Sequence, residues 1–295
     1  MYLICMKGYY NMDLTSPRTI RNIQEQFGFT FKKGLGQNFL TARNILEEIV
    51  DAAEIESGVI EVGPGFGVLT SELAQNSDKV VTIEIDERLI DVLDYTLAEY
   101  DNVKIINEDI LKLDLKKVID DEFNGEKVSI AANLPYYITT PIITKLLEEK
   151  LPIKNIVVMV QKEVAERMPA KPSTKDYGAI TVLCQYYTEP SIVANVPASL
   201  FVPPPKVDSA VLKLKVLDKP SVEVKDEGVF FRVVKAAFSQ RRKTLLNCLS
   251  ANFPIPKDEI STLLESIGIA PSRRGETLSL EEFANIADTL LQKIK

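Results

Sequence analysis

Short apolar runs rich in β-branched residues alternate with longer amphipathic stretches from about residue 41 to residue 200. The apolar runs are typical of buried strands, whereas the longer stretches repeat apolar positions every three or four residues, as helices do. We expect strands at 58–63, 79–86, 103–109, 126–133 and 155–161, and helices at 44–53, 66–75, 87–100, 141–150 and 162–168. This alternation predicts βαβ units, and therefore an α/β fold whose parallel sheet carries helices on both faces.

The pattern changes beyond this region. Residues 179–197 and 209–217 are still apolar and β-branched, and we expect them to form further, antiparallel strands at the sheet edge. The proline-rich run FVPPPKVDS at 201–209 marks the change, because only helical periodicity follows the second of these stretches.

The C-terminal region reads as a small helical unit. Five of its apolar positions fall on one helical stripe: Phe230, Val234, Ala237, Leu245 and Leu249. Ser279 and Glu282 have the spacing of a capping box at the start of a last helix. The predicted organisation is an N-terminal extension at 1–30, an α/β domain at 31–210 and an all-helical domain at 211–295.

Histidine is absent from all 295 residues, which narrows the chemistry. Without imidazole there is no histidine base and no histidine-ligated metal site, so we expect no metal and a cofactor that brings its own reactivity. Cys5, Cys184 and Cys248 are far apart and predict reduced thiols in a cytoplasmic protein. No apolar run approaches the ~18 residues of a membrane helix, and the N-terminus lacks the basic region of a signal peptide.

A glycine-rich loop follows the first strand of the α/β region, in the sequence EVGPGFG. Gly63 and Gly65 permit a sharp turn and a close approach to a ligand, although a plain strand-to-helix turn has the same composition. Glu84 ends the next strand, 21 positions after Gly63, where a carboxylate can accept hydrogen bonds from both ribose hydroxyls. The neighbouring Asp86 is expected to face solvent or to cap the following helix.

A third strand end supplies Asp109, which is placed to accept from the exocyclic amine of a bound adenine, with Ile110 beside the ring. Ligands of open α/β sheets bind at the carboxyl ends of strands, where these residues meet. The chain has no G-K-[ST] phosphate loop, so a nucleoside without a phosphate chain fits best. We therefore predict S-adenosylmethionine as the cofactor.

The fourth strand ends in the sequence NLPYYITTP, which starts at Asn133. The Asn133 side-chain oxygen and the Leu134 carbonyl can accept the two N–H groups of an amine held in line with an activated methyl. Tyr136 offers a ring on which a base can stack, and Tyr137 is expected in the core. The alternative is an ordinary strand-to-helix connection with both tyrosines buried.

Basic residues concentrate in SQRRKT and SRRGE of the C-terminal region, with Lys32 and Lys33 near the N-terminal segment. We predict that these runs contact RNA phosphates, while a solvated helix face remains the alternative. The candidate RNA-binding residues are Arg241, Arg242, Lys243, Arg273 and Arg274. The net charge of −7 speaks against tight binding of free RNA and favours a pre-assembled particle as the substrate.

Motifs along almost the whole chain from about residue 31 resemble the ribosomal RNA adenine dimethyltransferase family, and most closely its 16S ribosomal RNA branch. They are GQNFL, EVGPGFGVLT, IEID, NEDIL, NLPYYITTPI, VVMVQKEVAERM, YGAITVLCQYY, FVPPPKVDSAV, FSQRRKTLLNCL and RRGETLSLEEFANIAD. The resemblance implies a class I methyltransferase sheet with a helical C-terminal domain. It also implies dimethylation of two adjacent adenines near the 3′ end of small-subunit RNA, and the net acidity favours RNA held in a 30S particle. We expect a monomer, because no strand edge or heptad pattern indicates self-association.

The resemblance also implies roles for single residues. Asn38 and Leu40 should contact S-adenosylmethionine, together with the glycine loop, the two strand-end acids and Asn133. Tyr136 and Phe201 should form two stacking walls around a flipped adenine, whose extrusion requires a few kcal/mol from a paired duplex.

Three other functions share part of these features. A 23S ribosomal RNA adenine methyltransferase of the macrolide-resistance type shares the cofactor motifs, but the C-terminal motifs fit the 16S branch better. A DNA adenine methyltransferase finds little support in the C-terminal half. A non-catalytic RNA-binding assembly factor would have lost the glycine loop, Glu84 or Asn133, all of which are present.

Overall fold

The computed structural model describes residues 12–29 and 38–294. Its main sheet has the strand order β4-β3-β2-β5-β6-β9-β7. These strands are β2 (Val59–Val62), β3 (Val80–Glu84), β4 (Val103–Asn107), β5 (Val128–Asn133), β6 (Ile153–Gln161), β7 (Thr188–Val196) and β9 (Ser209–Val216). The five strands from β4 to β6 are parallel, and β9 and β7 follow antiparallel. The predicted α/β class is confirmed.

The order of the strands reverses beside β2. The chain passes outward from β2 to β3 and β4, then returns to place β5 on the other side of β2. A crevice forms at such a switch point because the loops after the two central strands leave in opposite directions. The ends of β2 and β5 therefore flank the place where a ligand is expected.

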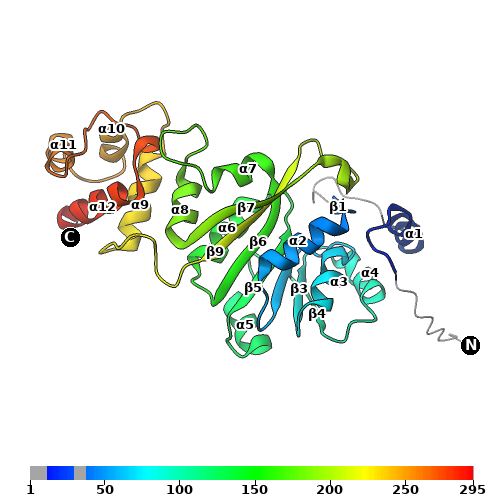
Figure 1. The fold of residues 1–295 in the computed structure, drawn as a ribbon. Coiled ribbons are helices and arrows are strands. Elements are labelled where there is room, and N and C mark those ends of the chain that lie inside the picture. The colour runs from blue at the N-terminus through cyan, green and yellow to red at the C-terminus, as the bar shows by residue number, and fades with distance from the viewer. Residues whose placement is uncertain (1–11, 30–37, 295) are drawn as a thin grey trace, which may run out of the picture.

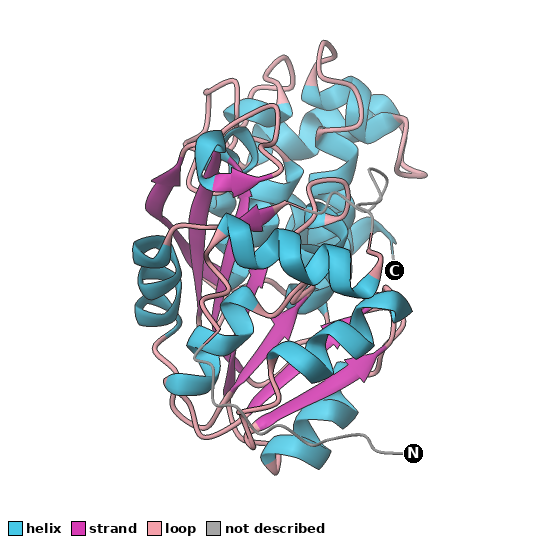
Figure 2. Cartoon of the chain, turned by 90° about the vertical axis from the view of Figure 1, so that its right-hand side faces the viewer, coloured by secondary structure: helices cyan, strands magenta, loops and turns pink. Residues whose placement is uncertain are grey.

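Helices cover both faces of the sheet (Figure 2). The helices of the described residues are α1 (Pro17–Phe27), α2 (Arg43–Ala53), α3 (Val68–Gln75), α4 (Ile90–Thr96), α5 (Leu115–Phe123), α6 (Thr139–Glu148), α7 (Lys162–Arg167), α8 (Ala179–Tyr187), α9 (Glu227–Ala237), α10 (Leu245–Ser250), α11 (Lys257–Ser266) and α12 (Leu280–Ile294). Short 3₁₀ turns occur at Glu87–Leu89, Ala198–Leu200 and Gly275–Thr277. Figure 1 shows α9 to α12 gathered at one end of the molecule and α1 at the opposite end.

Successive residues of the central strands pack into two different hydrophobic layers. In β6, Ile156, Val158 and Val160 join the layer formed with α5, α6 and α8. Val157 and Met159 join the layer formed with α1, α2, α3 and α4. This alternation explains why the strands read as continuous apolar runs, since both of their faces are buried.

One expected strand is a helix instead. Residues 179–197 were expected to be extended, but α8 occupies Ala179–Tyr187 and only β7 continues as a strand. The Gly178 amide donates to the Thr181 hydroxyl over 3.0 Å and so caps the first turn. Periodicity distinguishes a helix from a strand only when one side of the element is polar. A run that is buried on several sides is apolar throughout, so its sequence pattern fits both conformations.

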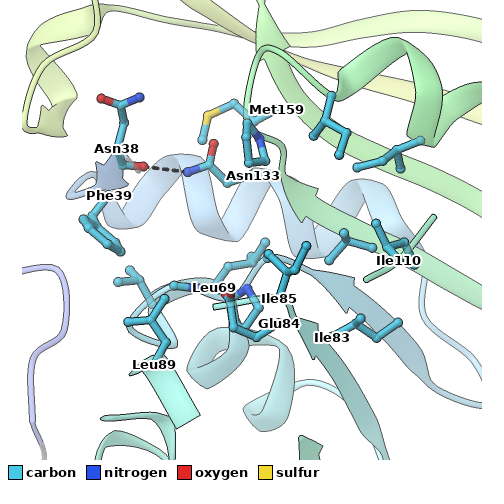
Figure 3. A pocket seen from close by; sticks show the side chains of 18 of the residues that line it. Asn38, Phe39, Leu69, Ile83, Glu84, Ile85, Leu89, Ile110, Asn133 and Met159 are labelled. Atoms are coloured by element: carbon cyan, nitrogen blue, oxygen red, sulfur yellow. Dashed lines mark hydrogen bonds between the residues drawn. The ribbon is translucent and has the colours of Figure 1, made fainter. Parts of the chain in front are cut away.

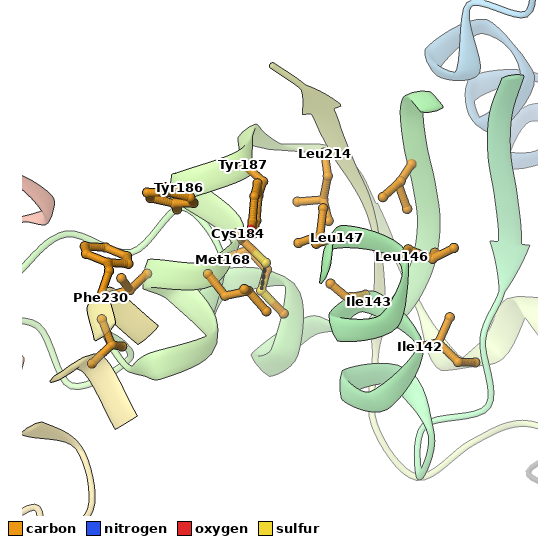
Figure 4. Packing of buried hydrophobic residues seen from close by; sticks show 14 of the residues in the cluster. Ile142, Ile143, Leu146, Leu147, Met168, Cys184, Tyr186, Tyr187, Leu214 and Phe230 are labelled. Carbon is orange, nitrogen blue, oxygen red and sulfur yellow. Dashed lines mark hydrogen bonds between the residues drawn. The ribbon is translucent and has the colours of Figure 1, made fainter. Parts of the chain in front are cut away.

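The helical region packs directly onto the sheet region. All five residues of the predicted stripe are buried, and the Tyr186 and Phe230 rings stack with their centroids 4.8 Å apart (Figure 4). The predicted boundary at residue 210 falls inside β9, which lies between β6 and β7. The sheet region therefore extends to Val216, since the proline-rich run leads into a central strand.

The N-terminal segment at residues 12–29 packs onto the core through its apolar side. Ile20 and Ile23 of α1 are buried, and Phe29 contacts the Phe66 ring edge-on at 5.3 Å between centroids. The expected capping box of α12 is confirmed, because the Ser279 amide donates to Glu282 Oε2 over 2.9 Å and the Glu282 amide donates back to the Ser279 hydroxyl.

Candidate active site

The glycine loop turns sharply between β2 and α3. Gly63 and Gly65 have φ angles of 71° and 60°, in the left-handed region where a side chain is strained. A Cβ atom on Gly65 would lie 2.6 Å from the Phe39 ring, whereas one on Gly63 would have no neighbour within 4 Å. Gly63 therefore faces open space in a pocket, and Gly65 is required by packing.

The Phe39 side chain packs against this loop at Gly65. It belongs to β1 (Phe39–Leu40), which pairs with β8 (Phe201–Val202) in a separate two-stranded sheet. The Phe39 ring stacks on Phe66 with centroids 4.3 Å apart. Leu40 is buried beside it, and both residues line the pocket, as does Asn38. The predicted positions of Asn38 and Leu40 are thus at the pocket, while Phe39 was missed because only the fold brings it under the glycines.

Glu84 lies at the carboxyl end of β3 and also lines the pocket. One carboxylate oxygen accepts from the Asp86 amide at 2.8 Å, and the other accepts from the Gly65 amide at 3.4 Å. Burial raises the pKa of Glu84, while these amide hydrogen bonds act in the opposite direction. The acid therefore holds the glycine loop in place. Asp86 caps the next turn by accepting from the Arg88 amide, as one of its two predicted alternatives stated.

Asp109 and Ile110 follow β4 and line the same pocket. An oxygen of Asp109 accepts from the Leu111 amide over 3.0 Å, which fixes the direction of its carboxylate. Ile110 is 6% exposed and belongs to the hydrophobic core. The structure thus brings the glycine loop and both strand-end acids to one pocket. Figure 3 shows Glu84 and Ile110 at this pocket.

Asn133 ends β5 with its amide oriented by another segment. Its Nδ2 donates to the backbone carbonyl of Asn38 over 2.9 Å (Figure 3). Because that contact must use the N–H side of the amide, the Oδ1 atom faces elsewhere, and no described residue donates to it. The Leu134 carbonyl likewise accepts from no described residue, while its N–H is bound to Met159 O at 3.1 Å. Two consecutive residues at the strand end therefore each keep an acceptor that receives no hydrogen bond from the described residues, although only Asn133 of the two lines the pocket.

The two tyrosines lie in different surroundings. Tyr136 does not line the pocket, and its hydroxyl lies 2.7 Å from that of the buried Ser209. Tyr137 was expected in the core but is 58% exposed and lines the pocket. The expectation for Tyr137 is corrected, since a residue after the strand end is not bound to the alternation inside it.

Phe201 is not positioned as a free stacking wall. Its backbone pairs with Leu40, so it lies near the pocket, but its side chain is only 3% exposed and packs in the core. A buried ring has no free face for an adenine. In this structure the expected second wall is therefore closed.

The five predicted RNA-binding residues differ in their surroundings. Arg273 is engaged inside the protein: its guanidinium contacts both carboxylate oxygens of Glu282, one of them at 2.9 Å, and donates to the Thr277 hydroxyl and carbonyl. Arg241 reaches the Lys175 carbonyl at 3.2 Å and remains largely exposed. Arg273 therefore acts as a structural residue.

Arg242, Lys243 and Arg274 are accessible to an RNA ligand. Arg242 and Lys243 are exposed and form no ion pair with a described residue. Arg274 is half exposed and lies 3.9 Å from a carboxylate of Glu276. Lys32 and Lys33, which precede the site, lie outside the described residues.

A second buried acid was missed by sequence reasoning. Glu61 in β2 is 1% exposed, and burial raises its pKa to about 8. The Thr70 hydroxyl donates to it over 2.5 Å, which couples β2 to α3 behind the glycine loop. A charged residue inside an otherwise apolar strand is the signal that could have revealed it.

Residues 12–29 and 38–294 hold neither a cluster of three metal-ligating side chains nor a helix with the length and apolar character to cross a membrane.

Comparisons with known proteins agree with this geometry. A family model described as ribosomal RNA adenine dimethylase matches residues 28–292. Proteins named ribosomal RNA small subunit methyltransferase A from Bacillus mycoides (strain KBAB4) and Bacillus anthracis (strain CDC 684 / NRRL 3495) are each 54% identical over 95% of this chain and 98% of their own.

Two solved structures are similar over most of the chain. A dimethyladenosine transferase from Plasmodium falciparum has a TM-score of 0.70 and 30% identity, covering 84% of this chain and 95% of its own. The 23S rRNA methyltransferase ErmE has a TM-score of 0.65 and 28% identity, covering 86% of this chain and all of its own.

Proposed function

The chain belongs to the ribosomal RNA adenine dimethylase family, and on this premise we propose that it dimethylates two adjacent adenines near the 3′ end of 16S ribosomal RNA, during biogenesis of the small subunit. Membership makes it a methyltransferase that acts on ribosomal RNA. The high identity to proteins named small subunit methyltransferase A supports the 16S branch. The observation that carries the mechanism is the pair of unused acceptors at Asn133 and Leu134.

The residues of the pocket fit S-adenosylmethionine as the methyl donor. Gly63 leaves open space where any side chain would project, and the buried Glu84 carboxylate suits two ribose hydroxyls. Asp109 can accept from an adenine amine, with the apolar Ile110 beside the ring. Asn38 and Leu40 close the pocket from the N-terminal segment. When bound, this cofactor supplies a methyl group on a sulfonium, which is already activated for displacement.

Asn133 and Leu134 hold the amine that receives the methyl group. An adenine amine has its lone pair delocalised into the ring, so it becomes a nucleophile only when its N–H groups are directed away from that plane. The Asn133 oxygen and the Leu134 carbonyl accept these two N–H groups and orient the nitrogen. Both acceptors are neutral and need no histidine, consistent with a chain that contains none.

The second methylation uses the same acceptors differently. A monomethylated amine has one N–H left, so one of the two acceptors has no partner in the second round. The Asn133 amide is fixed by its bond to Asn38, which keeps its oxygen in place in both rounds. We propose that Asn133 is the acceptor used in both rounds, with Leu134 dispensable in the second.

Tyr136 is proposed as the stacking wall for the target adenine. Its hydroxyl contact with Ser209 fixes the ring, so little side-chain entropy is lost when a base stacks on it. Phe201 could join it only if its buried ring moved, so Tyr136 carries this role alone in the structure as it stands.

We propose that the RNA side is formed by Arg241, Arg242, Lys243 and Arg274, without Arg273. Backbone phosphates are bound through charge, so exposed cations contribute most. Arg242 and Lys243 form no ion pair with a described residue, whereas Arg241 and Arg274 share the carboxylate of Glu276 and should contribute less. The overall charge of −7 favours a pre-assembled 30S particle over free RNA, and a cytoplasmic monomer is the simplest form of such an enzyme.

One experiment tests the function directly. The protein is incubated with labelled S-adenosylmethionine and small subunits from a strain that lacks the dimethylation, and the modified bases are mapped. Dimethyladenosine at two adjacent positions near the 3′ end of 16S RNA is expected. Its absence there refutes the proposal.

The similarity to ErmE makes a 23S ribosomal RNA methyltransferase the second candidate. Protein-free large-subunit RNA in a parallel reaction distinguishes the two. Label in that RNA, with none in small subunits, would select the second candidate.

A further inference from the structure

Tyr137 occupies an edge of the cofactor pocket that none of the roles above explains. It lies on the loop after β5 and is 58% exposed, yet it lines the same pocket as Glu84, Asp109 and Ile110. Removing the face of an aromatic ring from water is favourable, so a ring at the edge of a pocket gains when a ligand covers it. Its position at a pocket edge therefore calls for an occupant that covers it.

The surroundings of its hydroxyl show which end of the pocket Tyr137 faces. Partial burial raises the pKa of Tyr137, and the carboxylates of Asp109 and Glu84 raise it further. These two acids end β4 and β3, on the side of the crevice away from β6. The hydroxyl nevertheless forms no hydrogen bond with a described residue. Tyr137 thus faces the two acids assigned to the adenosine part of the cofactor, without being tied to either.

The neighbouring Tyr136 has the opposite arrangement. Its hydroxyl is held by Ser209 at the start of β9, and its ring does not line the pocket. The two consecutive side chains of this turn therefore separate, with one ring toward β9 and the other toward β3 and β4. The pair can serve two different ligands, the target base and the cofactor.

We propose that Tyr137 is a cofactor-binding residue whose ring closes the adenosine end of the pocket and packs against bound S-adenosylmethionine. The inference rests on the proposed function, since it assumes that this cofactor occupies the pocket. Contact with the adenosine part is the same before and after transfer, because that part takes no part in the chemistry. Tyr137 should therefore affect KM for the cofactor and leave kcat unchanged.

The first test measures binding of S-adenosylhomocysteine, the unreactive product, by isothermal titration calorimetry. Tyr137→Ala is expected to raise Kd about tenfold, the effect of losing one stacked ring. Tyr137→Phe keeps the ring and should stay within about threefold of the wild type. Tyr95→Ala is the matched control, because Tyr95 is 44% exposed but contacts Phe27 of α1 and does not line the pocket.

A second test uses the absence of tryptophan from this chain. Tyr137→Trp introduces a single tryptophan at the pocket edge, and Tyr95→Trp places one at the control position. Saturation with S-adenosylhomocysteine should shift or quench the emission of the first variant, because its ring leaves water. The emission of the second variant should not change.

The outcomes separate this inference from the function on which it rests. If the wild type binds S-adenosylhomocysteine while Tyr137→Ala binds within twofold and Tyr137→Trp emission is unchanged, the inference is wrong and the function stands. A fall in kcat at saturating cofactor, with Kd unchanged, also overturns it and assigns Tyr137 to the target side. If the wild type binds no S-adenosylhomocysteine, the cofactor assignment fails and this inference fails with it.

Discussion

Replacing Asn133 by alanine tests the central step of the mechanism. The substitution removes the Oδ1 acceptor for the amine and also the Nδ2 donor that binds Asn38 O at 2.9 Å. The two losses have different consequences. Loss of the acceptor affects the transition state, whereas loss of the donor loosens the N-terminal wall of the cofactor pocket.

The expected magnitudes follow from these two contacts. A fixed polar group aimed at a reacting centre contributes about 3–4 kcal/mol, so kcat should fall about 10²–10³-fold. One partly buried neutral hydrogen bond contributes about 1 kcal/mol, so the Kd of S-adenosylhomocysteine should rise no more than about fivefold. Transfer is thus predicted to suffer far more than cofactor binding.

The assay is single-turnover methyl transfer to dimethylation-deficient small subunits at saturating S-adenosylmethionine, with product binding measured by calorimetry. Asn102→Ala is the matched control, because Asn102 also donates through Nδ2 to backbone carbonyls, those of Ala74 and Ser77, both at 2.8 Å, and does not line the pocket. The control should lose stability and keep its rate. If Asn133→Ala retains a rate within about threefold of the wild type, the role assigned to Asn133 is refuted.

Three further predictions concern the glycine loop, the buried acid and the basic surface. Gly65→Ala should lower the melting temperature more than Gly63→Ala, because the added Cβ would lie 2.6 Å from the Phe39 ring. Gly63→Ala should mainly weaken cofactor binding in calorimetry, because its Cβ enters the open space of the pocket. Glu61 has its pKa raised from 4.5 to about 8, so the folded protein retains a proton that the unfolded chain has lost. Stability should therefore fall between about pH 5 and pH 8 by up to ~1.4 kcal/mol per unit, and Glu61→Gln should flatten this slope in urea unfolding. Arg273→Ala should destabilise the fold by about 2 kcal/mol in the same unfolding assay and change RNA affinity little, because its donors bind protein groups. Arg242→Ala should weaken RNA binding and lower its salt dependence by about one unit at unchanged stability.

Each of these predictions has an outcome that contradicts it. Equal melting temperatures for Gly63→Ala and Gly65→Ala would mean that the Phe39 ring can move aside for the added Cβ. If the stability of Glu61→Gln still falls between about pH 5 and pH 8 as in the wild type, a group other than Glu61 causes the fall. An Arg273→Ala variant that is as stable as the wild type but binds RNA poorly would mean that Arg273 contacts RNA.

Much of the cofactor side of the site could be predicted from the sequence. Alternating apolar and amphipathic runs specify parallel strands, and parallel strands place their carboxyl ends at one edge. The residues that end β2, β3, β4 and β5 therefore had to meet, and Gly63, Glu84, Asp109 and Asn133 all line one pocket. The capping box of α12 was also readable, because its two hydrogen bonds are local.

The tertiary structure alone decided which side chains were free to act. Arg273 and Arg274 are neighbours in one basic run, yet only the fold brings Glu282 against the first. Phe201 was expected to expose a ring face but packs into the core, whereas Tyr137 was expected in the core but is exposed at the pocket. Burial and partner choice depend on contacts between segments far apart in the chain, which periodicity and residue type do not encode. The same holds for Asn133, whose residue type suggested an acceptor, while its contact with Asn38 across 95 positions decides which atom is available.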